Sequence, residues 1–176
     1  PARTVAVIGD STFLHSGITG LMNIVYNKGR STVIILDNSI TGMTGHQQNP
    51  ATGKDIRGDA APAVDLEQLC RALGVSDVKT VDPFDMPALR EALLASLAFD
   101  GPSVIIARRP CALLSKARTA SLRVTQSCIG CRRCMGIACP ALIFEAGRAR
   151  VDISLCNGCG LCASVCPKGA IVKEEM

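Results

Sequence analysis

Eight of the ten cysteines lie in two short runs with nearly the same spacing. The runs are Cys128, Cys131, Cys134 and Cys139-Pro140, followed by Cys156, Cys159, Cys162 and Cys166-Pro167. The second run has the pattern C-x-x-C-x-x-C-x-x-x-C-P, which binds 4Fe-4S clusters through cysteine thiolates. A pair of structural zinc sites is the alternative, but such sites seldom use three cysteines in close succession. The spacing therefore predicts two 4Fe-4S clusters and one-electron chemistry.

A second set of polar residues follows two apolar segments near the start of the chain. The set comprises Gly9, Asp10 and Ser11 after residues 3–8, and Asp37 and Asn38 after residues 32–36. Magnesium prefers oxygen ligands and commonly shares them with a diphosphate. Asp10, Asn38 and a loop carbonyl are therefore candidate magnesium ligands. Helix capping and turn formation are the alternative roles for Asp and Asn.

The residues around this second set alternate between short apolar runs and helical patterns. We expect buried strands at residues 3–8, 32–36, 78–81 and 104–107, and helices at residues 16–27, 64–73 and 87–98. This alternation indicates a parallel sheet flanked by helices, with ligands bound beyond the carboxyl ends of the strands. Lys28-Gly29 is the expected end of the first helix. Residues 39–62 form a long glycine-containing loop, a feature that is usually functional or disordered.

The alternating pattern ends between Cys111 and Leu122, and we place the domain boundary there. The prediction is an α/β domain at residues 1–118 and a small α+β domain at residues 119–176. Each cysteine run is followed by an apolar segment, which indicates an internal duplication. A domain of this size commonly depends on bound metal for its stability.

Composition argues against several classes of function. The formal charge is +4, but two oxidised clusters would each add about −2, so the loaded chain would be near neutral. The chain has no basic run and few aromatic residues, which argues against nucleic-acid binding. Its longest apolar stretches are too short to cross a membrane. Metal-ligand spacing of the cysteines, without a signal-peptide pattern, leads us to expect a cytoplasmic protein.

The two sets of residues together resemble one enzyme family. Gly9-Asp10-Ser11, with Asp37-Asn38 and the adjoining residues 39–45, is similar to the thiamine-diphosphate motif of the 2-oxoacid:ferredoxin oxidoreductases. Within that family, a two-cluster ferredoxin domain fused behind the thiamine domain resembles the alpha subunit of the indolepyruvate-type enzymes. The resemblance covers essentially all 176 residues.

The resemblance implies a role for each residue of the thiamine motif. Asp10 and Asn38 would bind Mg²⁺ through their side chains, and Ile40 through its carbonyl oxygen. Further cofactor contacts are implied for Gly9 and Ser11 at the diphosphate, and for Met43 and Thr44 near the reactive end of thiamine diphosphate. His15 is a candidate for proton transfer on the substrate, whereas His46 is as well explained by loop packing.

The clusters are expected to share cysteines between the two runs. In two-cluster ferredoxins the fourth cysteine of each run binds the cluster of the other run. We therefore expect cluster 1 to be bound by Cys128, Cys131, Cys134 and Cys166, and cluster 2 by Cys156, Cys159, Cys162 and Cys139. The first run has four residues before its last cysteine instead of three. A loop bulge would absorb the extra residue, because Cys139 does not close its own loop.

The implied reaction is the thiamine-dependent oxidative decarboxylation of an aryl 2-oxoacid with coenzyme A. Electrons would leave through both clusters to an external ferredoxin. The family also needs a pyrimidine-binding domain with an activating glutamate, which we do not find in the sequence. We therefore expect a fragment or C-terminal piece of a longer subunit, with a beta-type subunit as its partner. The alternatives are another 2-oxoacid specificity, a non-redox decarboxylase, and an electron-transfer module with an α/β scaffold.

Other reactive or charged side chains receive no catalytic role. Cys70 lies on the apolar face of a predicted helix, and Cys111 follows Pro110, so both are expected to be structural. Basic residues are most often solvated surface. This interpretation applies to Lys54, Arg57, Arg108 and Arg109.

Overall fold

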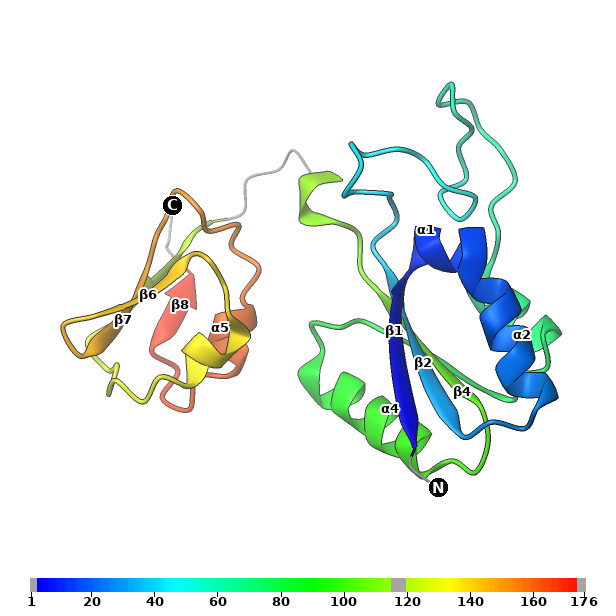
Figure 1. Ribbon diagram of the computed structural model, residues 1–176. Helices are drawn as coiled ribbons and strands as arrows, with labels where there is room; N and C mark the ends of the chain where they lie inside the picture. Colours follow the sequence, from blue (N-terminus) through cyan, green and yellow to red (C-terminus); the bar gives the residue numbers. More distant parts are fainter. Residues whose placement is uncertain (1–2, 115–119, 174–176) are drawn as a thin grey trace. The chain divides into compact units, whose positions relative to one another are not determined.

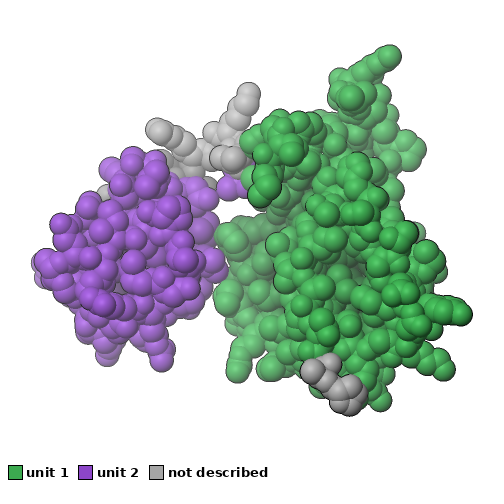
Figure 2. All heavy atoms as spheres, in the orientation of Figure 1, with its two compact units in different colours: residues 1–111 green, residues 112–176 purple. Residues whose placement is uncertain are grey.

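Residues 3–114 and 120–173 are described by a computed structural model, and the chain divides into two units (Figure 2). Unit 1 comprises residues 1–111 and unit 2 comprises residues 112–176. The predicted boundary between residues 118 and 119 lies outside the described residues. Among the helices of the described residues, none is long and apolar enough to cross a membrane.

Unit 1 contains a sheet of four parallel strands. The strands are β1 (Thr4–Gly9), β2 (Ser31–Asp37), β3 (Asp77–Val81) and β4 (Ser103–Arg108), in the order β1-β2-β4-β3. Gly9 pairs with Leu36, and Asp37 pairs with Arg108. The carboxyl ends of the first three strands in this order therefore form one edge. The predicted parallel sheet flanked by helices is confirmed.

Helices cover both faces of this sheet, because the strands carry apolar side chains on both faces. Helix α2 (Ile18–Tyr26) lies on one side and α4 (Met86–Ala98) on the other (Figure 1). Helix α3 (Leu66–Ala72) contributes Leu66 and Cys70 to the core that contains Val33 and Ile106. On the α4 side, the Thr32 hydroxyl donates to the carbonyl of Ser96 at 3.4 Å. Cys70 is fully buried in this core, as its position on the apolar face indicated.

The prediction that the first strand is buried was wrong. Val5 is 45% exposed and Val7 is 61% exposed. Strand β1 is an edge strand with a partner on one side only, whereas β2 and β4 occupy the centre of the sheet. An apolar run alone does not distinguish an edge strand from a central one.

The first helix begins earlier than predicted. Helical structure starts at Asp10 and runs through α1 (Asp10–Thr12), the π-helical segment η1 (Phe13–Gly17) and α2. Residues 10–17 do not show the regular spacing of apolar residues that indicates an α-helix, because the π-helical turn changes the spacing of the buried residues. Gly17 permits this path, since a Cβ there would lie 2.9 Å from side-chain atoms of both Ile8 and Phe13.

The first helix closes at Lys28-Gly29 as predicted, with Lys28 in the left-handed conformation (φ 52°). The N–H groups of these two residues bond to the carbonyls of Val25 and Ile24 at 3.0 and 2.8 Å, the pattern of a Schellman motif. Helix α3 begins at Leu66 instead of residue 64, because the Asp65 carboxylate caps its first turn.

Unit 2 is built from two short antiparallel ribbons. One pairs β5 (Leu122–Val124) with β8 (Ile171–Lys173), and the other pairs β6 (Leu142–Glu145) with β7 (Arg148–Val151). Its helical turns are η2 (Ala112–Leu114), η3 (Arg133–Ile137) and α5 (Leu161–Ser164). Buried Cys134 and Cys162 belong to its small core together with Leu122, Leu142 and Ile171. The second domain is therefore the predicted small α+β unit.

Candidate functional site

Asp10 is a buried carboxylate at the carboxyl end of β1. It is 3% exposed, and its Oδ2 accepts a hydrogen bond from Asn49 Nδ2 at 3.1 Å. Burial raises the pKa of the Asp10 carboxyl and nearby Asp37 adds to the rise, while bonds from the Ser11 N–H and from Asn49 oppose it. A charged carboxylate is therefore costly here, and a bound cation would relieve that cost.

Asp37 and Asn38, at the carboxyl end of the adjacent strand β2, have different hydrogen-bond partners. Asp37 Oδ2 accepts from Arg108 Nε at 2.6 Å, and its Oδ1 accepts from the Ser39 N–H at 3.1 Å. Asn38 Oδ1 accepts from the Ile40 N–H at 3.1 Å, which turns the chain into the loop. The Asp37 charge is thus paired with an arginine, whereas Asn38 has a neutral amide oxygen, a candidate metal ligand, at the start of the loop.

The loop that follows β2 is attached to the start of the first helix. Thr41 Oγ1 donates to Ser11 Oγ at 2.9 Å, and Ile40 is buried. In Figure 1 this loop runs beyond the carboxyl ends of the strands, on the same side as α1. A Cβ placed on Gly9 would meet no atom within 4 Å, so the backbone there faces open space. Open space beside the N–H groups at a helix start suits an anion such as a diphosphate.

The structure brings together only part of the predicted thiamine site. Gly9, Asp10, Ser11, Asn38 and Ile40 all belong to this edge of the sheet, linked by the bonds described above. The remaining three predicted residues, His15, Met43 and Thr44, have exposed side chains. Thr44 donates to Gln47 within its own turn, and Met43 projects into solvent, so neither is held against Asp10 or Asn38.

Two residues that the sequence did not single out support the site. Asn49 is buried and bonds to Asp10, and Arg108 pairs with Asp37. Arg108 could have been found by aligning the ends of the strands, since it pairs with Asp37 in the sheet register. Asn49 carried no signal beyond ordinary loop composition.

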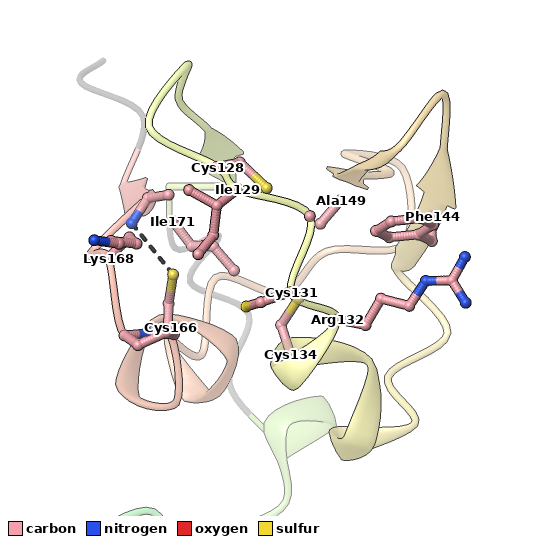
Figure 3. Close-up of a pocket in the computed structure, with 13 residues that line it drawn as sticks. Cys128, Ile129, Cys131, Arg132, Cys134, Phe144, Ala149, Cys166, Lys168 and Ile171 are labelled. Atoms are coloured by element: carbon pink, nitrogen blue, oxygen red, sulfur yellow. Dashed lines mark hydrogen bonds between the residues drawn. The ribbon is translucent and has the colours of Figure 1, made fainter.

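Four cysteines line one pocket of unit 2. The pocket has an empty volume of about 370 Å³, including its open side, and contains Cys128, Cys131, Cys134 and Cys166 (Figure 3). The electrostatics of the thiols give the same grouping. Burial raises the pKa of Cys134, and the other three pocket cysteines add to the rise.

The remaining four cysteines form a second group. Burial, followed by the charges of Cys159, Cys156 and Cys139, raises the pKa of Cys162 to about 11. Exposure repeats between the two runs, because the middle cysteines Cys131 and Cys159 are both exposed. Their neighbours Cys134 and Cys162 are both buried. The two runs therefore share one pattern of exposed and buried cysteines.

The peptide backbone around the cysteines suits thiolate ligands. The Gly158 N–H donates to Cys156 Sγ at 3.4 Å, and the Ala170 N–H donates to Cys166 Sγ at 3.3 Å. Such bonds stabilise anionic sulfur and tune a bound cluster. The extra residue of the first run lies in η3, which ends at a left-handed Ala138 with φ 54°.

The cysteine groups differ from a site for one ion. Within residues 3–114 and 120–173, no three His, Cys, Asp or Glu side chains are placed to hold a single metal ion. A cubane does not need that convergence, because its cysteines bind separate iron atoms at its corners. The four thiols around one pocket thus fit a cluster through their chemistry and number.

Comparison with known families identifies the first unit. Residues 1–107 match the model of the thiamine pyrophosphate enzyme C-terminal TPP binding domain. The chain belongs to the thiamine pyrophosphate enzyme family. Residues 149–172, which contain the second cysteine run, match the 4Fe-4S binding domain. The two matches therefore place a thiamine pyrophosphate-binding domain and a 4Fe-4S binding domain on one chain.

Relatives of this thiamine pyrophosphate family member combine both units. The chain is 46% identical over 176 residues to indolepyruvate oxidoreductase subunit IorA of Archaeoglobus fulgidus, covering 96% of this chain and 28% of that protein. It is 42% identical over 175 residues to the subunit of the same name from Methanothermobacter marburgensis, covering 98% and 28%. The chain thus spans just over a quarter of the length of these relatives. The predicted resemblance to the indolepyruvate-type alpha subunit is confirmed.

A solved structure supports the fold of the thiamine unit. A 2-oxoglutarate:ferredoxin oxidoreductase from Magnetococcus marinus superposes with a TM-score of 0.54 at 16% identity. The match covers 60% of this chain and 40% of that chain. At that identity the likeness concerns the fold alone.

Proposed function

We propose that this chain is the diphosphate-binding and electron-transfer part of a 2-oxoacid:ferredoxin oxidoreductase alpha subunit. The observation that supports this most strongly is the combination of a thiamine pyrophosphate-binding fold and a ferredoxin-like unit on one polypeptide. A decarboxylase that transfers no electrons has no use for clusters. A simple electron carrier has no use for a buried carboxylate at the ligand-binding edge of a parallel sheet.

The thiamine site would be held by residues at the ends of β1 and β2. Asp10 and the side chain of Asn38 would bind Mg²⁺ with the carbonyl of Ile40, while Gly9 and Ser11 would lie at the diphosphate. Bound thiamine diphosphate supplies an electron sink for decarboxylation. Asn49 holds the Asp10 carboxylate in place, and the Asp37–Arg108 pair fixes the turn that presents Asn38. His15, Met43 and Thr44 remain candidates for substrate-side contacts.

Two 4Fe-4S clusters would carry the electrons away. Support comes from the pocket formed by the cluster 1 cysteines and from the mutual effects of the cluster 2 cysteines on the pKa of Cys162. Each cluster accepts one electron at a time, so a two-electron oxidation is divided into single steps. The final acceptor in this proposal is an external ferredoxin.

The substrate of the complete enzyme is proposed from the names of the relatives. Similarity to indolepyruvate oxidoreductase subunits favours an aryl 2-oxoacid of the indolepyruvate type, with coenzyme A as acyl acceptor. The relatives are more than three times as long as this chain. That length leaves room for the pyrimidine-binding domain that the reaction needs, and a beta-type subunit completes the proposed enzyme. We place it in the cytoplasm.

Replacing Asp10 tests the proposal. Asp10→Ala should weaken Mg²⁺-dependent binding of thiamine diphosphate by more than the roughly 10–100-fold lost when an outer-shell partner of a metal is removed. Isothermal titration on the complete subunit measures this loss, while iron–sulfur absorbance should stay unchanged. Asp100→Ala is the matched control, because Asp100 is an exposed carboxylate that pairs with Arg30. Unchanged binding in Asp10→Ala would leave only an electron-transfer module.

A further inference from the structure

The described side chains of unit 2 carry more positive than negative charge. Residues 120–173 contain only two acidic side chains, Glu145 and Asp152. The basic side chains of the same residues are Arg123, Arg132, Arg133, Arg148, Arg150, Lys168 and Lys173. Long-range attraction to a partner depends on where such charge gathers. The distribution of these side chains between the two clusters is therefore informative.

The cationic side chains gather at cluster 1. Arg132 and Lys168 both line its cysteine pocket, and they lie on opposite sides of it in Figure 3. Arg148 lies next to Cys128, because its guanidinium and the Cys128 N–H both donate to the carbonyl of Thr125, at 2.8 and 3.2 Å. Positive side chains therefore flank the pocket of cluster 1.

Local structure holds these side chains in place. Arg132 has a left-handed backbone (φ 60°), and its guanidinium stacks on the Phe144 ring at 4.1 Å. Arg148 donates to the carbonyl of Thr125 at 2.8 Å. These contacts already restrict both side chains. Less conformational entropy is therefore lost when they form ion pairs with a partner. The charged rim of the pocket is therefore partly ordered before any partner binds.

The corresponding segment of the second cysteine run carries no charged side chain. Between Cys156 and Cys162 stand Asn157, Gly158, Gly160 and Leu161, whereas Arg132 and Arg133 occupy the same part of the first run. The exposed side chains just before Cys156 are uncharged, namely Ile153, Ser154 and Leu155. Cys131 and Cys159 are both exposed, so solvent exposure does not distinguish the two clusters. The charge of the neighbouring side chains does.

We propose that cluster 1 is the exit cluster and that its pocket rim, formed by Arg132, Lys168 and Arg148 around exposed Ile129, docks an acidic one-electron carrier protein. This inference rests on the proposed function. Positive charge steers an acidic partner to this rim and stabilises the more negative, reduced state of the nearby cluster. Ile129, 62% exposed, supplies an apolar contact inside the charged ring. In the transfer, cluster 1 loses one electron and the carrier gains it, with no proton moved.

Binding of an acidic ferredoxin to the cluster-loaded subunit tests the docking surface. An oxidised two-cluster ferredoxin of net negative charge is the probe, and isothermal titration at low salt is the readout. The Arg132→Glu/Lys168→Glu double variant should bind it at least tenfold more weakly, and Lys168→Glu alone should lose part of that affinity. The control Arg123→Glu/Lys173→Glu makes the same charge change on β5 and β8 and should stay within about twofold of the wild type. Equal losses in both double variants would overturn the proposal, as would no loss in either.

A redox titration followed by electron paramagnetic resonance separates this inference from the proposed function. In Arg132→Gln/Lys168→Gln, the midpoint potential of one cluster should move to a lower value while the other stays fixed. Equal movement of both potentials, or of neither, would contradict the exit assignment. Failure of the chain to assemble two clusters, or to bind thiamine diphosphate, would instead reject the proposed function. The charge-reversal result is read only in samples with wild-type cluster content.

Discussion

The two units place their functional residues differently with respect to their cores. In unit 1 the core consists of apolar side chains such as Leu66 and Ile106, and Asp10 lies at its rim. In unit 2 the buried cysteines Cys134 and Cys162 are themselves members of the core. The proposed thiamine site therefore lies at the edge of an apolar core, whereas cysteines proposed to bind the clusters are part of their own core.

This difference follows from size. Unit 1 has enough apolar residues to cover both faces of a sheet, so its site can use polar, costly groups at the edge of the strands. Unit 2 has two ribbons of three- and four-residue strands and little apolar material. Metal–thiolate bonds supply cross-links that such a small core lacks.

The largest expected effect is the unfolding of unit 2 when iron is removed. Anaerobic chelation should abolish hydrogen-exchange protection across β5 to β8, because the core then loses the groups that join Cys134 and Cys162 to it. Protection in β2 and β4 of unit 1 should persist. Hydrogen exchange read by mass spectrometry gives both results from one sample. Retained protection in unit 2 would show that its apolar residues keep it folded without iron. The two units would then not differ in their dependence on the site.

The next effect concerns the core of unit 1. Leu66→Ala leaves a cavity between α3 and the sheet, and we expect it to reduce the free energy of unfolding by about 2–5 kcal/mol. The matched control is Leu94→Ala on the exposed side of α4, with an expected change within about 0.5 kcal/mol. Urea unfolding followed by far-ultraviolet circular dichroism measures both. Iron–sulfur absorbance should be unaffected in either variant, since Leu66 belongs to a different core from Cys134 and Cys162.

The features that the sequence predicted well are those with a short-range signature. Apolar runs alternating with helical patterns indicated the parallel sheet, and the cysteine spacing indicated the second unit. Asp10 and Asn38 were placed at one edge because parallel strands end together. Each of these signals depends on residue types at fixed spacing within a few positions.

The features that it did not predict depend on the order of strands and on packing. The exposure of Val7 follows from the edge position of β1, which no local pattern encodes. The early helix start at Asp10 depends on a π-helical turn, and the support of Asp10 by Asn49 joins residues 39 positions apart. Arg108 was assigned no role because a basic residue after a strand is usually solvated, yet the register places it beside Asp37.

The smallest expected effect concerns the ionised carboxylate of Asp77 in unit 1. The core of unit 2 contains no such carboxylate among its described residues. Burial raises the pKa of the Asp77 carboxyl, but Lys79 and the hydroxyls of Ser103 and Ser96 outweigh it and hold that pKa below its ordinary value. Ser103 Oγ donates to Asp77 Oδ2 at 2.6 Å. A depressed carboxyl pKa stabilises the fold above the unfolded-state pKa of about 3.9, and that stabilisation disappears as pH falls through the folded-state value.

Asp77→Asn should therefore cost about 1.5–3 kcal/mol near neutral pH, the range for hydrogen bonds to a charged group. The difference from wild type should shrink as the pH is lowered below about 4. Urea unfolding at a series of pH values, followed by circular dichroism, reports unit 1, because helices α2, α3 and α4 lie there and the only α-helix among the described residues of unit 2 is the four-residue α5. Asp100→Asn, in an exposed pair with Arg30, should show little change at any pH. A pH-independent cost for Asp77→Asn would mean that the side chain acts by packing, and that unit 1, like the core of unit 2, does not depend on the ionisation of this carboxylate.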